Sequence, residues 1–404
     1  MADWPNDHLG TYLTFRNGKK SPDRDDAARY PVFGSNGTIG RSNDTNADEN
    51  TIVIGRVGTY CGSLHFSKGP CWVTDNAIAC STPQEEARFW FYALSSLELN
   101  NYRAGSGQPL LNQSILKQIS YGVPPADHRK AIGEMLGTLD DKIELNRQTN
   151  ETLEAMARAF FKDWFVDFGP TRAKAEGRSP YLVPTLWDLF PDALKDDKPV
   201  GWVEETVHAQ AHWVNGAAYK NMHFTDAPNA LPVIKIVELK AGVTKNTKFT
   251  NTALGDKYRI TDGELLFSWS GNPDTSIDTF IWTGGDAWLN QHIFAVRNNG
   301  KRPLAFLYAM LKWLNPDFSE IARNKQTTGL GHVTQQDLKR LLVNIGSAEI
   351  MMAFDDLVAP IFDRIYRNLM EIRVLAETRD LLLPKLMYGE IRMHEAEIAV
   401  EAVV

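Results

Sequence analysis

The chain has 404 residues, of which 43% are hydrophobic and 23% are charged, so it can bury the cores of two or more domains. No apolar run reaches the roughly 18 residues that span a bilayer, and the first ten residues lack the basic and apolar regions of a signal peptide, which predicts a cytoplasmic protein. Its three cysteines show no spacing typical of a disulfide framework or a zinc site. The net charge of −7 means that any affinity for nucleic acid must come from local patches or a basic partner.

Residues 1–125 predict a first mixed α/β domain. Short β-rich runs at 51–57 and 72–80 alternate with Gly and Asn turns, and 85–99 predicts a helix. The segment carries 11 basic and 12 acidic side chains, so it is nearly neutral.

Residues 126–165 predict a first long helix. The stretch 139–165 contains no Pro or Gly, and its apolar positions step alternately by four and three, the 3.5-residue period of a helix lying along another helix. Aromatic residues gather at its end, where we expect packing against the second helix or a partner subunit. The predicted packing or docking residues are Ile132, Leu136, Leu139, Ile143, Asn146, Asn150, Leu153, Phe160, Phe161 and Trp164.

A proline-rich stretch at 166–200 predicts a linker, and 201–345 predicts a second mixed α/β domain with 15 basic and 13 acidic side chains. Strands are expected at 264–269, 279–282 and 293–296, and a helix at about 303–314. Residues 346–390 predict a second long helix and 391–404 a tail. Pro360 should interrupt this helix, so that its continuous part begins at Ile361, and Pro384 should end it.

The second helix repeats the stepping of four and three. Its predicted packing or docking residues are Ile361, Ile365, Asn368, Ile372, Leu375 and Leu382. Asn on such a seam either fixes the register of the two helices at a cost in stability or is simply exposed to water at a loose seam.

Four ordered coincidences indicate that the chain is an internal duplication. Trp4 stands thirteen residues before Asn17-Gly18, and Trp202 stands thirteen before Asn215-Gly216. The other matched pairs are the apolar runs 52–54 and 265–267, each followed by a Gly, then Leu116-Lys117 with Leu338-Lys339, and Asp140-Asp141 with Asp355-Asp356. The predicted fold class is therefore two similar mixed α/β domains separated by two long antiparallel coiled-coil helices.

The sequence contains no convincing catalytic or metal site. His208 and His212 have metal-ligand spacing, but Ala209 replaces the glutamate of a zinc protease helix. Leu13 occupies the place where a phosphate-binding loop preceding Lys19 would need its first Gly. We therefore expect a chain that is not an enzyme and that binds no metal or cofactor of its own.

Two glycine-rich loops at equivalent places suit a polyanion, because glycine allows close backbone approach and each loop precedes a predicted helix cap. An ordinary loop closing each domain is the alternative. The predicted DNA-binding residues of these loops and their helices are Arg103, Ser106, Gln108, Lys117, Lys325, Thr328, His332 and Lys339.

Further basic and amide side chains could contact phosphates or base edges, although a solvated surface role is the alternative for each. They are Lys19, Lys20, Arg41, Arg56, Lys68, Lys245, Lys248, Lys257, Arg259, Gln291 and His292.

The segments GSGQPLLNQSILKQISYGVPP, LDDKIELNRQTNETLEAMARAFFKDWFVDFGP and RDLLLPKLMYGEI together closely resemble the specificity subunit of type I restriction-modification enzymes. The second loop departs from the first because TTGLGH lacks its Gln-Pro. The resemblance implies two target-recognition domains on two antiparallel spacer helices and a bipartite double-stranded DNA site contacted in the major groove. It also implies docking of two modification subunits, which use S-adenosylmethionine to methylate adenine, and of restriction subunits that use ATP and Mg.

Two other functions stay open at this stage. One is a single-chain DNA methyltransferase or nuclease of a related restriction system. The other is a module that binds carbohydrate rather than DNA, with some of the eleven Trp as sugar platforms.

Overall fold

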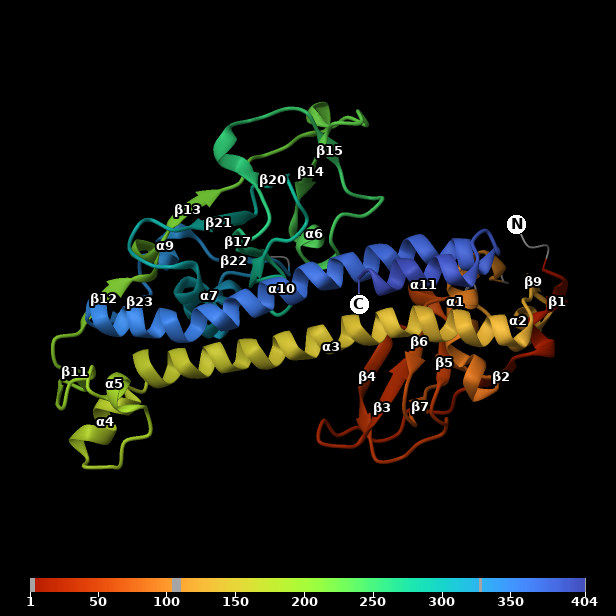
Figure 1. Cartoon of the computed structure of the whole chain (residues 1–404), viewed down its shortest axis with the longest axis horizontal. Helices are drawn as coiled ribbons and strands as arrows, with labels where there is room; N and C mark the ends of the chain where they lie inside the picture. Colours follow the sequence, from red (N-terminus) through yellow and green to blue (C-terminus); the bar gives the residue numbers. More distant parts are fainter. Residues whose placement is uncertain (1–3, 104–109, 327–328, 404) are drawn as a thin grey trace. The chain divides into compact units, whose positions relative to one another are not determined.

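The structure is a computed structural model that describes residues 4–103, 110–326 and 329–403. The chain forms two compact units, unit 1 from residues 1–144 and 374–404 and unit 2 from residues 145–373. Two helices of 40 residues each, α3 (Ala126–Phe165) and α10 (Ala348–Met387), contribute residues to both units (Figure 1). Each unit thus contains one strand-rich domain together with its share of both long helices.

The domain of unit 1 is built on a four-stranded antiparallel sheet. Its order is β2 (Thr14–Asn17), β8 (Ala77–Ser81), β5 (Thr51–Gly55) and β6 (Leu64–Ser67). The central strand β5 is buried along its whole length, as its apolar sequence predicts. A second sheet has the order β4 (Gly37–Ser42), β3 (Tyr30–Gly34) and β7 (Trp72–Val73), with β3 and β7 parallel. The remaining elements are the pair β1 (Asn6–His8) with β9 (Ser120–Gly122) and the helices α1 (Ala87–Ser95) and α2 (Gln113–Gln118).

The domain of unit 2 repeats this plan. Its first sheet has the order β13 (His212–Asn215), β21 (Ile293–Arg297), β17 (Leu265–Ser268) and β19 (Asp278–Ile281). Its second has the order β15 (Phe249–Thr250), β14 (Leu231–Ile234), β20 (Ala287–Leu289) and β16 (Arg259–Ile260), with β14 and β20 parallel. Two further strand pairs are β12 (Val203–Thr206) with β23 (Leu342–Ile345) and β18 (Ser270–Gly271) with β22 (Gly331–His332). The helices of this domain are α6 (Ile236–Ala241), α7 (Leu304–Trp313), α8 (Asn315–Asn324) and α9 (Gln335–Leu338).

The predicted internal duplication is confirmed by this shared order of strands. Three of the four sequence coincidences fall on equivalent elements: the Asn-Gly pairs end β2 and β13, the apolar runs form β5 and β17, and the Leu-Lys pairs lie in or just after α2 and α9. The Asp pairs are not equivalent. Asp140 lies 14 residues after the first residue of α3, whereas Asp355 lies 7 residues after that of α10.

The two long helices are paired within each unit, as predicted. In unit 2 the side-chain amide of Asn368 donates to the Asn150 Oδ1 at 2.8 Å, and the rings of Phe161 and Phe354 lie 6.2 Å apart. Asn150 comes before Phe161 in α3, whereas their partners come in the opposite order in α10, so the helices run antiparallel there. In unit 1 the Arg379 Nη1 donates to the Asp140 Oδ1 at 2.6 Å.

Two expectations about prolines are wrong, because α10 is continuous through Pro360 and Pro384. Both prolines lie on the exposed side of the helix. Next to Pro360, Val358 and Ile361 are buried in the core of unit 2, and this burial offsets the lost backbone hydrogen bond. The last residue of α10 is instead Met387. Gly389 follows it, and its φ of 64° and its N–H bond to the Leu386 carbonyl are typical of a glycine C-cap.

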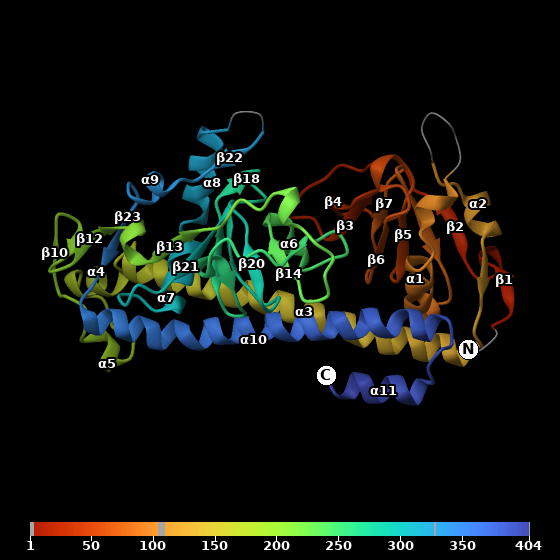
Figure 2. The same cartoon turned by 90° about the horizontal axis from the view of Figure 1, so that it is seen from above.

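The expected strand at 72–80 is two strands, because a turn at Asp75 and Asn76 separates β7 from β8. Residues 166–200 contain α4 (Gly169–Ala175), α5 (Pro184–Trp187) and the hairpin β10 (Leu194–Lys195) with β11 (Lys198–Pro199). After α10, helix α11 (Met393–Glu401) turns back along the end of α10 (Figure 2). Among the described helices, none combines the length and the apolar character needed to cross a membrane.

Candidate nucleic-acid interface

The same backbone framework surrounds the end of the central strand in both units. In unit 1 the N–H of Arg56 donates to the Asn76 carbonyl at 3.0 Å, and the Arg56 carbonyl accepts from Leu111 at 3.1 Å. In unit 2 the N–H of Trp269 donates to the His292 carbonyl at 3.3 Å, and the Trp269 carbonyl accepts from Val333 at 2.8 Å. The residue after the central strand is therefore held between a turn and the segment that leads into α2 or α9.

The Asn-Gly repeat is explained at the same place. A Cβ on Gly18 would lie 2.0 Å from the Thr74 carbonyl oxygen, and one on Gly216 would lie 2.1 Å from that of Asn290. Only glycine lets the chain come this close, which brings β2 and β13 against their neighbouring turns. The Asn beside each glycine, Asn17 or Asn215, is exposed at the strand end.

Four side chains gather at the strand end of unit 2, and we name Asn215, Trp269, Gln291 and His292 the second strand-end cluster. The Trp269 Nε1 donates to the Asn215 Oδ1 at 2.9 Å, and the Trp269 and His292 rings lie 5.5 Å apart. The Gln291 amide nitrogen lies 3.2 Å from the His292 Nε2. Burial lowers the pKa of His292, so this ring is neutral near pH 7.

The equivalent residues of unit 1 are Asn17, Arg56, Asp75 and Asn76, which we name the first strand-end cluster. The pairing of Lys19 with Thr74 in unit 1 and of Ala217 with Asn290 in unit 2 fixes this correspondence. Asn17, Asp75 and Asn76 are exposed. The Arg56 Nε is buried and has no hydrogen-bond partner among the described residues. The sequence predicted Arg56, Gln291 and His292, but it missed Asn17, Asp75, Asn76, Asn215 and Trp269; the Asn-Gly repeat was the available indication.

The residues predicted in the two glycine-rich loops are described only in part. Ser106, Gln108 and Thr328 lie outside the described residues. Arg103 is exposed and its Nε donates to the Asn100 carbonyl at 2.8 Å. His332 lies in β22 opposite Ser270, next to the second strand-end cluster.

Lys325 has a structural partner rather than a free charge. Its Nζ lies 2.5 Å from the buried carboxylate of Asp337, which also accepts the N–H of Thr334 at 2.7 Å. The capping box of Thr334 and Asp337 is confirmed, and it places a negative charge at the start of α9. In unit 1 the Asn112 Oδ1 caps α2 by accepting the Ile115 N–H at 2.9 Å. The start of α9 therefore carries a buried carboxylate, whereas the cap of α2 is an uncharged amide.

Internal contacts also occupy several of the other predicted basic residues. Lys68 pairs with Asp141 of α3 at 2.6 Å, and Arg259 pairs with Asp286 at 2.6 Å. The Arg41 guanidinium donates to the carbonyls of Ala28 and Arg29. The Lys257 Nζ lies 5.0 Å from the centroid of the Tyr258 ring. The remaining candidates are exposed side chains at scattered positions: Lys19, Lys20, Lys117, Lys245, Lys248 and Lys339.

His208 and His212 do not share a helix, because His208 lies in a 3-10 turn and His212 begins β13. Their helical spacing in the sequence therefore has no structural meaning. Within residues 4–103, 110–326 and 329–403, no group of three or more His, Cys, Asp or Glu side chains could hold a metal ion.

The predicted helix-packing residues are buried or partly buried within the two units. Asn150, Leu153, Phe160 and Ile372 are partly buried, and the following are buried: Ile132, Leu136, Leu139, Ile143, Asn146, Phe161, Trp164, Ile361, Ile365, Asn368, Leu375 and Leu382. Polar contacts fix each domain on α3. Tyr92 of α1 donates to the Asp140 Oδ2 at 2.5 Å in unit 1, and Tyr308 of α7 donates to the Glu154 Oε2 at 3.0 Å in unit 2.

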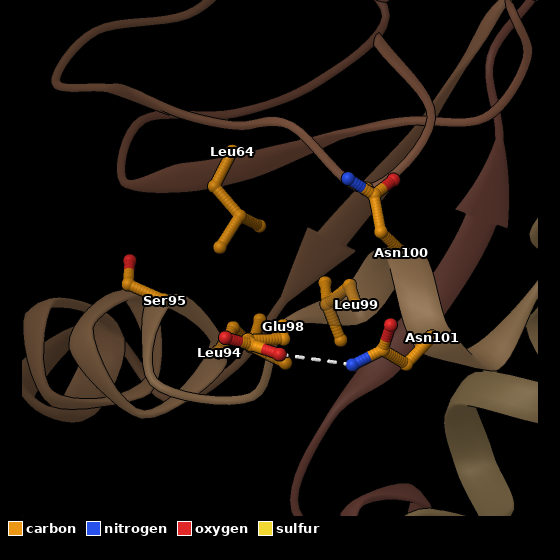
Figure 3. A pocket seen from close by; sticks show the side chains of 8 residues that line it. Leu64, Leu94, Ser95, Glu98, Leu99, Asn100 and Asn101 are labelled. Carbon is orange, nitrogen blue, oxygen red and sulfur yellow. Dashed lines mark hydrogen bonds between the residues drawn. The ribbon is translucent and has the colours of Figure 1, made fainter. Parts of the chain in front are cut away.

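A hollow of about 340 Å³ in unit 1 lies near the end of α1 (Figure 3). Its lining includes Leu64 of β6, the end of α1 at residues 94–95, and residues 98–101, with the Asn101 amide donating to the Glu98 Oε2 at 2.9 Å. No residue of either strand-end cluster lines it. The hollow is therefore separate from the duplicated framework.

A family model described as the type I restriction modification DNA specificity domain matches residues 3–155 and again residues 200–377. The chain belongs to this family. The two matches begin near the first strand of each domain and extend into α3 and α10, so each covers one copy of the duplication. The chain is a type I restriction-modification specificity subunit, and its role is DNA recognition.

Relatives agree with the family, and a solved structure shares the fold. The type I restriction enzyme MjaIX specificity subunit of Methanocaldococcus jannaschii is 26% identical over 76% of this chain and 70% of its own length. The HindI specificity subunit of Haemophilus influenzae is 25% identical over 75% of this chain and 77% of its own length. The crystal structure of a type I restriction-modification S subunit from M. genitalium superimposes with a TM-score of 0.58 at 16% identity, covering 95% of this chain and 96% of the other, and shows the shared fold.

Proposed function

We propose that this specificity subunit recognises a bipartite double-stranded DNA site. The strand-rich domain of unit 1 contacts one half-site, that of unit 2 contacts the other, and the base pairs between the half-sites are not read. The duplicated sheet order carries this proposal, because two copies of one recognition domain in one chain suit two separate stretches of DNA.

The two long helices set the number of unread base pairs in this proposal. Each has 40 residues and so extends about 60 Å at ~1.5 Å per residue. One turn of DNA spans about 34–36 Å. Helices of this length are long enough to hold two half-sites more than one turn apart, and their paired polar residues, Asn150 with Asn368 and Asp140 with Arg379, fix their register.

Catalysis belongs to partner subunits in this proposal. Two modification subunits dock on this chain and methylate adenine with S-adenosylmethionine, and restriction subunits that use ATP and Mg join them. Methylation of a base within a duplex requires that the base be flipped out, at a cost of a few kcal/mol that contacts to the half-sites help to offset. Membership in a specificity-subunit family supports this division of labour.

Methylome sequencing tests the proposal. Cells without other adenine methyltransferases would express this chain with the modification subunit encoded beside it, and a parallel culture would express the modification subunit alone. We expect methylated adenines in one two-part motif with a gap of constant length, only when both proteins are present. A continuous motif, or the same motif without this chain, would contradict the proposal.

A further inference from the structure

The two copies of the recognition domain can be compared position by position, because one framework occurs twice in the same chain. The hydrogen bonds that hold Arg56 and Trp269 are repeated, and so are those that hold the following turns. For example, the N–H of Gly18 donates to the Ala77 carbonyl at 3.1 Å, and that of Gly216 donates to the Ile293 carbonyl at 3.0 Å. Differences between the copies at these positions are therefore differences of side-chain chemistry on one backbone.

The Asn-Gly pair and the buried Leu before Lys117 or Lys339 keep their identity in both copies, whereas three of the four strand-end positions do not. Other framework positions, such as Thr74 and Asn290, also differ. Gly18 and Gly216 are identical, and Leu116 and Leu338 are both fully buried. At the strand end, Asn17 and Asn215 are the same residue. The other three positions change from Arg56, Asp75 and Asn76 to Trp269, Gln291 and His292.

A constant framework that carries variable polar side chains is the arrangement that two different half-sites require. Arg contacts guanine, Asn and Gln contact adenine, and Asp accepts a hydrogen bond from cytosine in the major groove. Four of the six variable residues, Arg56, Asp75, Asn76 and Gln291, are of these types, whereas most of the predicted lysines can only neutralise phosphate.

Contacts within the second strand-end cluster prepare its amides for such hydrogen bonds. The Trp269 indole holds the Asn215 oxygen at 2.9 Å, so the Asn215 NH2 group stays available at an exposed position. The His292 Nε2 lies 3.2 Å from the Gln291 nitrogen, which leaves the Gln291 oxygen as an acceptor. Side chains held in place lose less entropy when they bind, which favours discrimination between bases.

Each cluster also contains a buried polar atom without a partner. The Arg56 Nε in unit 1 and the His292 Nδ1 in unit 2 are buried and have no hydrogen-bond partner among the described residues. Buried polar groups normally have a partner, because leaving one unsatisfied costs about 1–3 kcal/mol. The two atoms lie at different positions of the framework, and each leaves its cluster with one polar group that a ligand could satisfy.

We propose that the two strand-end clusters determine which bases are recognised in the two half-sites, with Arg56, Asp75 and Asn76 acting in unit 1 and Trp269, Gln291 and His292 acting in unit 2. The proposal rests on the proposed function, and its ligand is the major-groove edge of base pairs. Gln291 and Asn76 are the residues to test first, because both are exposed in turns and neither side chain supports a core.

The test uses the complex of this chain with its modification subunit and a plasmid library with randomised target sites. Gln291→Ala should relax the preference at one or two bases of a single half-site by roughly tenfold to a hundredfold and leave the other half unchanged. Asn76→Ala should do the same in the opposite half. Gln84→Ala is the matched control, since Gln84 is exposed and lies outside both clusters.

A second substitution separates recognition from folding. Gln291→Glu keeps the size of the side chain but removes the amide donor, so we expect a shifted base preference, toward cytosine, at unchanged yield of assembled complex. If the wild type shows a two-part motif but all Gln291 and Asn76 variants keep it, or lose activity equally on every sequence, the strand-end proposal is wrong and the bipartite proposal stands. A wild type without a two-part motif would refute both.

Discussion

Replacement of Gly18 by alanine should destabilise unit 1 strongly. The new Cβ would lie 2.0 Å from the Thr74 carbonyl oxygen and 2.5 Å from that of Val73, whereas real Cβ atoms stay at least 3.0 Å away. The strand and the turn must therefore separate by about 1 Å, judged from the same distances. This separation would break two backbone hydrogen bonds, from Gly18 to Ala77 and from Lys19 to Val73.

The two lost bonds cost about 1 kcal/mol each, and overpacking adds about 1–3 kcal/mol, for a total of about 3–5 kcal/mol. For a unit of this size, such a loss lowers the melting temperature by about 10 °C. Gly216→Ala should have a similar effect on unit 2, because its Cβ would lie 2.1 Å from the Asn290 oxygen. Gly69→Ala is the matched control, since no atom lies within 4 Å of the place that a Cβ would take there and its φ is not in the left-handed region.

Thermal unfolding of the full chain, followed by limited proteolysis and mass spectrometry of the peptides, would show which unit opens first. We expect early cleavage in residues 4–103 for Gly18→Ala and in residues 203–345 for Gly216→Ala. Melting of Gly18→Ala within about 1 °C of the Gly69→Ala control would refute the close-approach reasoning.

Three further predictions concern stability and spacing. Burial would raise the pKa of Glu86, but hydrogen bonds from Arg129 and Trp90 lower it overall. The contribution of Glu86 to the stability of unit 1 is therefore present above the unfolded-state pKa and is lost as the pH falls through the lower folded-state pKa. Glu86→Gln should cost about 3 kcal/mol at pH 7 and flatten the acid side of the stability profile measured by urea unfolding. Asn150→Leu alone should destabilise unit 2 by about 1–3 kcal/mol, because it leaves the buried Asn368 amide without its partner. The variant with Leu at both 150 and 368 should recover that loss. If the two single substitutions were additive in a double-mutant cycle, the pairing would be contradicted. Removal of one heptad from α3 within 139–160, together with one from the paired part of α10, shortens each helix by about 10 Å. This length corresponds to about three base pairs of DNA. Methylome sequencing should therefore show a shorter gap between unchanged half-sites.

The long helices and the duplication could be predicted because both depend on patterns along the chain. The alternation of four and three places Ile132, Leu136 and Leu139 on one face, and the structure buries all three. The prolines of α10 were misjudged because the cost of a proline in a helix is a local quantity. Whether Pro360 breaks the helix depends on the burial of Val358 and Ile361 beside it, which the local sequence does not reveal.

Selection of basic residues from a sequence has a physical weakness, because the sequence does not show which charges are already paired. Lys68, Arg259 and Lys325 each pair with a carboxylate in their own unit, and for Lys325 the partner is 12 residues away in a capping box. Side chains that serve as internal partners are poor candidates for DNA contacts, since they must first give up a hydrogen-bonded ion pair. The strand-end residues were hard to find for the opposite reason: Asn17, Asn76 and Asn215 are uncharged and isolated in the sequence, and only the fold brings them to the ends of strands.

These internal pairs also explain how a chain with a net charge of −7 can be specific for DNA. Phosphate neutralisation contributes mostly affinity that does not depend on sequence, and discrimination comes from contacts to base edges. A subunit in which basic side chains such as Lys68, Arg259 and Lys325 are paired within their own domains contributes less of this affinity. It can still contribute discrimination through hydrogen-bonding side chains such as Asn76 and Gln291. In a complex whose other subunits supply positive charge, this separation keeps the specificity subunit from binding DNA tightly at the wrong sequence. The acidic character of the chain is then compatible with its role, because binding strength and base discrimination need not come from the same polypeptide.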